Sequence, residues 1–293
     1  QVWHGTSSGL ATSPAWTLEL DQEGAELGRG CAGAGDVNGD GFFDVVVGAP
    51  KYDDGHYDEG LVQVYYGSVE GLGDTAEFEA QIDQHDAWLG YAVSAAGDLN
   101  NDGYDDLVAG APRLSDSHYR EGIIYAWLGG ESGLSTRHFT WSPNQIEALA
   151  GSSLAPMGDV NNDGYGDVGV GIPGHDGGEG YAYIFKGGSS GLTTGTVMGV
   201  GGSSGSRLGT VVAMAGDVNG DGYLDIAVSE PGASFDTTSE GGVRIHLGNS
   251  SDDNNAVIGS PTQNRRVGEE TPIHAGAASD EDAFDVWIAA WSS

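Results

Sequence analysis

Four loops of the chain share one acidic pattern, Asp-x-Asn-x-Asp-Gly-x-x-Asp, whose side chains could bind a cation. The copies begin at Asp36, Asp98, Asp159 and Asp217, at intervals of 62, 61 and 58 residues. A hard dication such as calcium takes six to eight oxygen ligands, and alternate residues of a tight loop can turn their oxygens inward. The glycine permits the sharp reversal of the backbone that such a loop needs. The pattern therefore predicts four calcium-binding loops.

Each loop offers four side chains and one main-chain carbonyl, the latter from its aromatic residue. Three carboxylates crowded together would repel one another strongly without a cation, so a turn that is stable without metal is the weaker interpretation. The predicted calcium ligands, loop by loop, are Asp36, Asn38, Asp40, Phe42 and Asp44; Asp98, Asn100, Asp102, Tyr104 and Asp106; Asp159, Asn161, Asp163, Tyr165 and Asp167; and Asp217, Asn219, Asp221, Tyr223 and Asp225.

Two other kinds of calcium loop are excluded by the surrounding residues. An EF-hand needs a glutamate at position 12 of its loop, but that position holds the apolar residues Val47, Ala109, Val170 and Val228. Cysteine-rich calcium repeats are excluded because Cys31 is the only cysteine of the chain. We expect Cys31 to be a small buried apolar residue, since nothing nearby in the sequence marks a reactive thiol.

The acidic loops are part of a repeat that runs through the whole chain. A degenerate fifth copy at 276–285 has lost its calcium-binding residues. Between the loops, a strand-like motif that ends in glycine, such as Val64-Tyr65-Tyr66-Gly67, also occurs five times. Short apolar segments follow the four acidic loops directly and are typical of strands buried on both faces. These segments are 45–47, 107–109, 168–170 and 226–228.

Each repeat holds about four strands, which is the content of one β-propeller blade. We therefore expect an all-β chain that forms a single β-propeller of four-stranded antiparallel blades, five in number. The expected blades are approximately 21–82, 83–143, 144–200, 201–259, and 260–293 completed by 1–20. In this arrangement residues 1–20 supply the outer strands of the last blade and close the ring, which leaves no open sheet edge.

The composition restricts the partners of the chain. Forty-four acidic residues against 10 basic ones give a formal net charge of −34. Nucleic acids and anionic membranes are polyanions, so we expect neither as a partner. No apolar run approaches the length of about 18 residues that spans a bilayer, so membrane insertion is not expected either. No set of residues indicates a catalytic site, and we expect a binding module rather than an enzyme.

The acidic loops and their flanking residues resemble the FG-GAP repeat of integrin α-subunits and related bacterial proteins. Each loop is followed by an apolar strand that ends in Gly-Ala-Pro or a variant of it, as at 48–50 and 110–112. Leu-Gly precedes three of the loops, at 27–28, 89–90 and 208–209, whereas the third copy has Ala150-Gly151. Integrin propellers have seven blades, so a part of a seven-bladed propeller, or a ring completed by a second copy, is the alternative to five blades.

The resemblance implies an extracellular or cell-surface β-propeller that binds calcium and acts in protein–protein interaction or cell adhesion. Some propellers of this kind are lectins, so carbohydrate binding is the alternative. In this family the calcium loops join the first and second strands of each blade on the lower face. Ligands commonly bind the loops of the opposite, upper face.

Aromatic, basic and histidine side chains mark the predicted upper-face loops as the place for a protein or glycan ligand. We expect nearby acidic residues to steer a cationic or calcium-bridged ligand to them; the alternative is that these loops are ordinary solvated connections. The candidate contact residues are Tyr52, His56, Tyr57, Arg113, His118, Tyr119, His175 and Phe235. The expected steering residues are Asp53, Asp54, Asp58 and Glu59.

Overall fold

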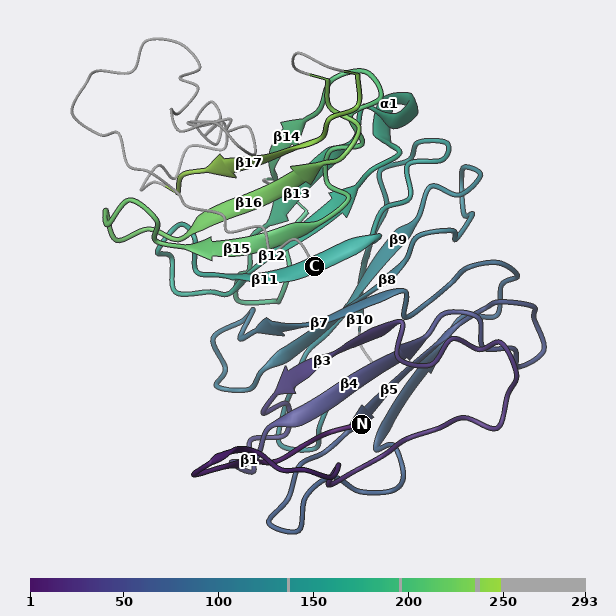
Figure 1. Ribbon diagram of the computed structural model, residues 1–293, viewed down its shortest axis with the longest axis vertical. Coiled ribbons are helices and arrows are strands. Elements are labelled where there is room, and N and C mark those ends of the chain that lie inside the picture. The colour runs from purple at the N-terminus through teal and green to yellow at the C-terminus, as the bar shows by residue number, and fades with distance from the viewer. Residues whose placement is uncertain (136–137, 195–196, 235–237, 249–293) are drawn as a thin grey trace.

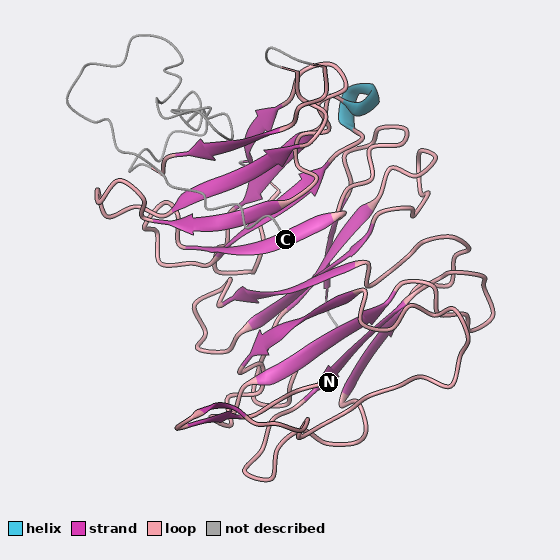
Figure 2. Cartoon of the chain, in the orientation of Figure 1, coloured by secondary structure: helices cyan, strands magenta, loops and turns pink. Residues whose placement is uncertain are grey.

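The structure is a computed structural model that describes residues 1–135, 138–194, 197–234 and 238–248. Its described strands form four successive antiparallel sheets and a short N-terminal hairpin (Figures 1 and 2). The first sheet contains β3 (Gly30–Gly35), β4 (Asp44–Ala49), β5 (Leu61–Tyr65) and β6 (Phe78–Gln81). The second contains β7 (Ala92–Gly97), β8 (Asp106–Ala111), β9 (Ile123–Trp127) and β10 (His138–Trp141).

The third and fourth sheets continue the same order. The third contains β11 (Ser153–Gly158), β12 (Asp167–Ile172), β13 (Tyr181–Phe185) and β14 (Val197–Gly201). The described strands of the fourth are β15 (Val212–Gly216), β16 (Asp225–Glu230) and β17 (Gly242–His246). A four-residue helical turn, α1 (His175–Gly178), follows β12. No helix in the described part of the chain is long and apolar enough to cross a bilayer.

The four sheets are stacked face to face, with each strand paired to the next along the chain. Their first strands, β3, β7, β11 and β15, lie beside one another in succession (Figure 1). This arrangement is consistent with successive blades of a β-propeller. The predicted apolar strands after the acidic loops are confirmed as β4, β8, β12 and β16.

Burial between neighbouring sheets explains why these strands do not alternate apolar with polar residues. All six residues of β8 are buried. One of its faces contributes Leu107 and Ala109 to a core shared with Val62 and Val64 of the first sheet. The other contributes Val108 to a core shared with the third sheet. A strand with a packed sheet on either side needs apolar side chains at every position.

Glycines set the distance between the sheets. A Cβ atom at Gly48 of β4 would lie 2.0 Å from the carbonyl oxygen of Gly90, at the start of the next module. The corresponding distance from Gly110 to Gly151 is 2.1 Å. The same contact recurs between Gly171 and the oxygen of Gly209, at 2.0 Å. The backbones of neighbouring modules therefore touch at the glycine of the Gly-Ala-Pro segment, or its Gly-Ile-Pro variant, and the glycine of the Leu-Gly pair, or its Ala-Gly variant.

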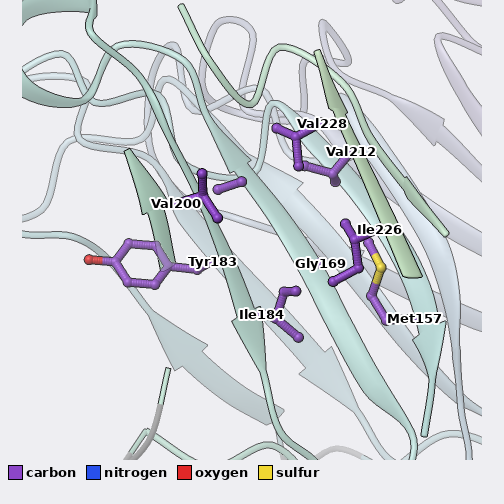
Figure 3. A pocket seen from close by; sticks show the side chains of 9 residues that line it. Met157, Gly169, Tyr183, Ile184, Val200, Val212, Ile226 and Val228 are labelled. Atoms are coloured by element: carbon purple, nitrogen blue, oxygen red, sulfur yellow. The ribbon is translucent and has the colours of Figure 1, made fainter. Parts of the chain in front are cut away.

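The small cavity between the third and fourth sheets belongs to the core. Its volume is about 10 Å³, and Figure 3 shows apolar side chains such as Met157, Val212 and Ile226 around it. A cavity of this size is at the lower limit for one water molecule and offers it no polar partners.

The N-terminal segment lies on the face of the first sheet that is turned away from the second. It contains β1 (Gly5–Thr6) and β2 (Gly9–Leu10), and Val2 pairs with Trp16. The indole of Trp16 donates a hydrogen bond to the carbonyl of Gly73 over 2.9 Å and packs edge-on against Tyr65. A cavity of about 410 Å³ remains between this segment and strands β3 and β4.

Cys31 lines that cavity, and its exposure corrects the prediction of a buried residue. The residue lies on the outer face of β3, which no further sheet covers among the described residues. The predicted fifth module, 260–293, and the degenerate loop at 276–285 lie outside the described residues. The five blades, the module boundaries and ring closure by residues 1–20 therefore stay predictions.

The glycine contacts predict a sharp difference between two Gly→Ala variants of the first sheet. Gly48→Ala should lower the free energy of unfolding by about 1–3 kcal/mol, because the added methyl group meets the backbone of Gly90. Gly33→Ala is the matched control, since a Cβ atom there has no neighbour within 4 Å. Urea denaturation of both variants checks this, and a Gly48→Ala variant as stable as Gly33→Ala would contradict it.

Candidate metal centres and the opposite loops

The four acidic loops join the first and second strands of the four sheets, as between β3 and β4. In each loop the leading aspartate accepts hydrogen bonds from at least two backbone amides further along. Asp36 accepts from Asp40 N–H through Oδ1 over 3.1 Å and from Gly41 N–H through Oδ2 over 2.9 Å. The corresponding bonds to Asp98, Asp159 and Asp217 are 2.8–3.1 Å long.

The asparagine and the second aspartate of each loop are also turned into it. Asn38 accepts a hydrogen bond from Asp40 N–H over 3.0 Å and donates one to Asp40 Oδ2 over 3.0 Å. Asp40 Oδ1 accepts from Phe42 N–H over 2.9 Å. The same bonds recur in the other three loops. Each loop thus gathers carboxylate and amide oxygens within one turn of chain.

The last aspartate of each loop is buried and has two backbone donors. Asp44 accepts from Val37 N–H over 2.9 Å and from Gly67 N–H, just beyond β5, over 2.8 Å. Asp106, Asp167 and Asp225 have equivalent donors at 2.7–3.0 Å. All four side chains are at most 1% exposed. This carboxylate therefore fixes the acidic loop to the end of the third strand.

Burial makes three of these carboxyl groups unusually weak acids. Desolvation raises the pKa of Asp44 to about 6 and the pKa values of Asp106 and Asp167 to about 7. The backbone donors lower these pKa values, and the other two aspartates of each loop raise them by charge repulsion. A cation in the loop would offset both the desolvation and the repulsion.

Neighbouring loops are tied to each other. Asp105 of the second loop accepts a hydrogen bond from Asp36 N–H over 2.8 Å, and its own N–H donates to the carbonyl of Asp36 over 3.1 Å. Gly166 of the third loop donates to the carbonyl of Asp98 over 2.8 Å. The conformation of one acidic loop thus depends on the next module.

The donor atoms fit a hard cation, because every predicted ligand in these loops is an oxygen. The aspartates are not, however, the tightest group of acidic and histidine side chains in the described part of the chain. Only His56, Glu59 and Asp83 bring three ligand atoms within 4.8 Å of one another. The assignment of the twenty loop ligands to calcium stays a prediction.

The loops after the second strands lie at the opposite edge of the sheets, because each second strand leads away from its acidic loop. Two of the predicted contact residues are well exposed there, Tyr57 at 65% and Tyr119 at 54%. They occupy corresponding positions of the first and second modules. Most of the others are partly buried: Tyr52 packs against the core of the first sheet, and His175 against Tyr181. Phe235 lies outside the described residues.

Asp58 and Glu59 correct the prediction of acidic steering residues. Asp58 is 6% exposed and Glu59 is wholly buried, so neither presents its charge to an approaching ligand. Their loop turns these two side chains under the linker that leads into β7. Asp53 and Asp54 are exposed, as expected.

That linker also carries Asp86 and Trp88, which the sequence analysis missed and which contact arginines of the loop between β8 and β9. The guanidinium of Arg113 lies 4.1 Å from the centre of the Trp88 ring and 2.8 Å from the carboxylate of Asp86. Arg120 approaches the same carboxylate over 3.0 Å. These contacts join residues more than 20 positions apart in the sequence, so no local sequence pattern predicts them.

Comparison with known proteins identifies the repeat. The FG-GAP repeat model matches residues 32–65, 89–127 and 208–246. This chain carries FG-GAP repeats. The third module lies outside the matched ranges, yet it forms the same four-stranded sheet, β11 to β14. Its departures from the motif at Ala150 and Ile172 leave the sheet intact.

The FG-GAP chain is similar to integrin α-subunits. It is 32% identical to integrin alpha-5 of Xenopus laevis over 72% of this chain and 20% of the relative. It is 34% identical to integrin alpha-V of Gallus gallus, over 62% of this chain and 17% of the relative. The FG-GAP chain spans about a fifth of the length of these curated relatives.

A solved structure, rhamnogalacturonan lyase of Bacillus licheniformis, is also similar, with 13% identity. The match covers 67% of the FG-GAP chain and 39% of the lyase, with a TM-score of 0.42. A score of that size carries no argument about function.

The raised pKa values predict how stability depends on pH in calcium-free buffer. The folded protein holds protons on Asp44, Asp106 and Asp167 up to pH 6–7, whereas an unfolded aspartate loses its proton near pH 4. The folded state therefore binds more protons between these values, and the free energy of unfolding should fall as the pH rises from 5 to 8.

Urea denaturation across this pH range measures the trend, and Asp106→Asn is the matched variant. Its amide does not titrate, so the fall in stability with pH should be shallower than in the parent protein. A stability that rises with pH, or an equal slope in both proteins, would contradict the assignment.

Proposed function

We propose that this chain is a calcium-binding β-propeller module that acts outside the cell in protein–protein interaction or adhesion. The observation that carries the proposal is the fourfold acidic loop, folded in the same way in four successive modules, three of which match the FG-GAP repeat. The similarity to integrin α-subunits supports an adhesive role. The proposed role is binding rather than catalysis.

In each module the ion would be held by the loop side chains and the aromatic residue's carbonyl. In the second loop these are Asp98, Asn100, Asp102 and Asp106, with the carbonyl of Tyr104. A bound calcium ion would supply the positive charge that three neighbouring carboxylates lack. The aspartate that holds the loop to the third strand would then stay ionised without the cost of repulsion. Calcium would thus stabilise the acidic edge of the propeller.

The proposed partner surface is the opposite edge, where Tyr57 and Tyr119 are exposed. Loops on a rigid scaffold can vary without harm to the fold, and tyrosine and arginine are enriched at the cores of interfaces. The guanidinium of Arg120 lies 4.9 Å from the centre of the Tyr119 ring, and Asp86 pairs with both Arg120 and Arg113. A protein partner on this surface would meet aromatic and basic groups close together.

A glycan is the second candidate ligand, because the two tyrosines occur at corresponding positions of two modules. A sugar-binding propeller should repeat its contact residues from blade to blade. The third module interrupts the repetition with Gly177 at this position, and this favours a protein partner.

Calcium should stabilise the protein strongly. Loops of this type in extracellular modules bind calcium with a Kd of about 10⁻⁴–10⁻³ M. A hundredfold excess over Kd stabilises by about 2.7 kcal/mol per site. We therefore expect chelation to lower the Tm markedly and titration calorimetry to show four sites in the full chain.

Asp102→Asn should remove one of these sites, and Asp74→Asn should remove none. Asp74 is an exposed residue outside the acidic loops and carries the same charge change. A chain that takes up no calcium, or whose Tm is the same with and without chelator, would refute the calcium proposal.

The double variant Tyr57→Ala/Tyr119→Ala should lose binding without loss of calcium. Against a panel of immobilised matrix and cell-surface proteins and a glycan array, we expect its binding to fall at least fivefold, because truncation of a central aromatic costs more than about 1 kcal/mol. Phe43→Ala is the control, since Phe43 is an aromatic residue, 79% exposed, at the acidic edge. Loss of binding in Phe43→Ala, with the tyrosine variant unchanged, would place the partner at the acidic edge instead. The array results distinguish a protein from a glycan.

A further inference from the structure

Three side chains of metal-binding type meet at the edge opposite the acidic loops. One ligand atom from each of His56, Glu59 and Asp83 lies within 4.8 Å of the other two. His56 and Glu59 belong to the loop between β4 and β5, and Asp83 to the linker between β6 and β7. The group is separate from the four acidic loops and from Tyr57, whose side chain is exposed.

Glu59 is buried without a full set of partners. Its side chain is wholly inaccessible, and Oε1 accepts a hydrogen bond from Asp54 N–H. Oε2 has no hydrogen-bond partner and lies 3.4 Å from Nδ1 of His56. That nitrogen is itself buried and without a hydrogen bond. Burying a carboxylate oxygen and an imidazole nitrogen without hydrogen bonds lowers the stability of the fold, unless a positive charge lies between the two atoms.

Backbone hydrogen bonds hold the two segments of this group together. Asp86 N–H donates to the carbonyl of Tyr57 over 2.8 Å, and Trp88 N–H donates to the carbonyl of Asp58 over 3.1 Å. In return, Tyr57 N–H donates to Nδ1 of His85 over 3.0 Å. The ring of His85 packs edge-on against the ring of His56, with centres 4.8 Å apart. The loop and the linker therefore bring His56, Glu59 and Asp83 together in the folded chain.

From this geometry we infer that His56, Glu59 and Asp83 form a transition-metal site of the zinc type. Imidazole and carboxylate together suit zinc, whereas calcium takes oxygen ligands alone. Zinc binds nitrogen and oxygen at about 2.0–2.2 Å. The exposed side chain of Asp83 can close on an ion held between the other two residues, and a water molecule would take the fourth position.

The second module contains a natural control. His118 and Glu121 repeat the first pair, with Nδ1 and Oε2 3.6 Å apart. Here Glu121 is better satisfied: Oε1 accepts from three backbone amides, those of Asp116, Ser117 and His118, and Oε2 accepts from the hydroxyl of Ser142. The residue in the place of Asp83, seven positions before the glycine that starts the next module, is Asn144. The second pair lacks the third ligand, and we expect no zinc there.

Zinc titration of the full chain in saturating calcium tests the proposal, because calcium then occupies any all-oxygen site. We expect one zinc ion per chain by calorimetry, and Co²⁺ in its place should give the visible absorption of a nitrogen and oxygen site. Asp83→Asn and His56→Gln should each weaken zinc binding at least tenfold. His118→Gln should bind zinc like the parent protein. Circular dichroism would verify that all three variants fold.

Three results would overturn the proposal. The first is no zinc uptake either with or without calcium, which would leave His56 and Glu59 as a simple ion pair. The second is equal weakening by His118→Gln, which would indicate scattered surface histidines. The third is zinc uptake that calcium abolishes, which would place zinc in the acidic loops. Calcium uptake is measured separately, so failure here leaves the proposed calcium-dependent function standing.

Discussion

A buried aspartate at the end of each acidic loop is the constraint on which the modules depend. Asp44 and its three counterparts each accept two backbone hydrogen bonds, one from their own loop and one from just beyond the third strand. The loop, the second strand and the third strand are thereby fixed to one another. The price is a carboxylate in an apolar setting beside two like charges. For Asp44, Asp106 and Asp167, whose pKa values are raised by this burial, the stability of the fold is coupled to protonation.

Contacts between glycine backbones extend this constraint from one module to the next. Gly48, Gly110 and Gly171 approach the following module more closely than any side chain would allow. The sheets are then near enough for apolar side chains on both faces of β8 and β12 to be buried. Hydrogen bonds between neighbouring acidic loops, such as that from Asp36 N–H to the carboxylate of Asp105, also join one module to the next. Each module is therefore shaped by its neighbours as well as by its own residues.

The loops at the two edges of the sheets differ in how closely they repeat the same residues and hydrogen bonds from module to module. At the acidic edge the same hydrogen bonds recur in all four loops, and the loop side chains are used to hold each loop in its fold. At the opposite edge the modules diverge: the first has Asp83 beside its His–Glu pair, and the second has Asn144 in its place. Variation on a rigid scaffold is how loops acquire binding functions. Residues that distinguish the first module from the second, such as Asp83 and Asn144, therefore lie at the edge opposite the acidic loops.

The sequence by itself determined the repeat, the strands that follow the acidic loops and the FG-GAP character of the modules. These features depend on residue spacing and on local patterns, which can be recognised in the sequence without knowledge of the structure. Tertiary structure alone decided the burial of Glu59, the exposure of Cys31 and the approach of Asp83 to His56. These outcomes depend on which segments are packed over which, because a side chain's burial is set by neighbours distant in the sequence. Asp83 lies in a different connection from His56, and only the pairing of four strands into one sheet brings the two connections together.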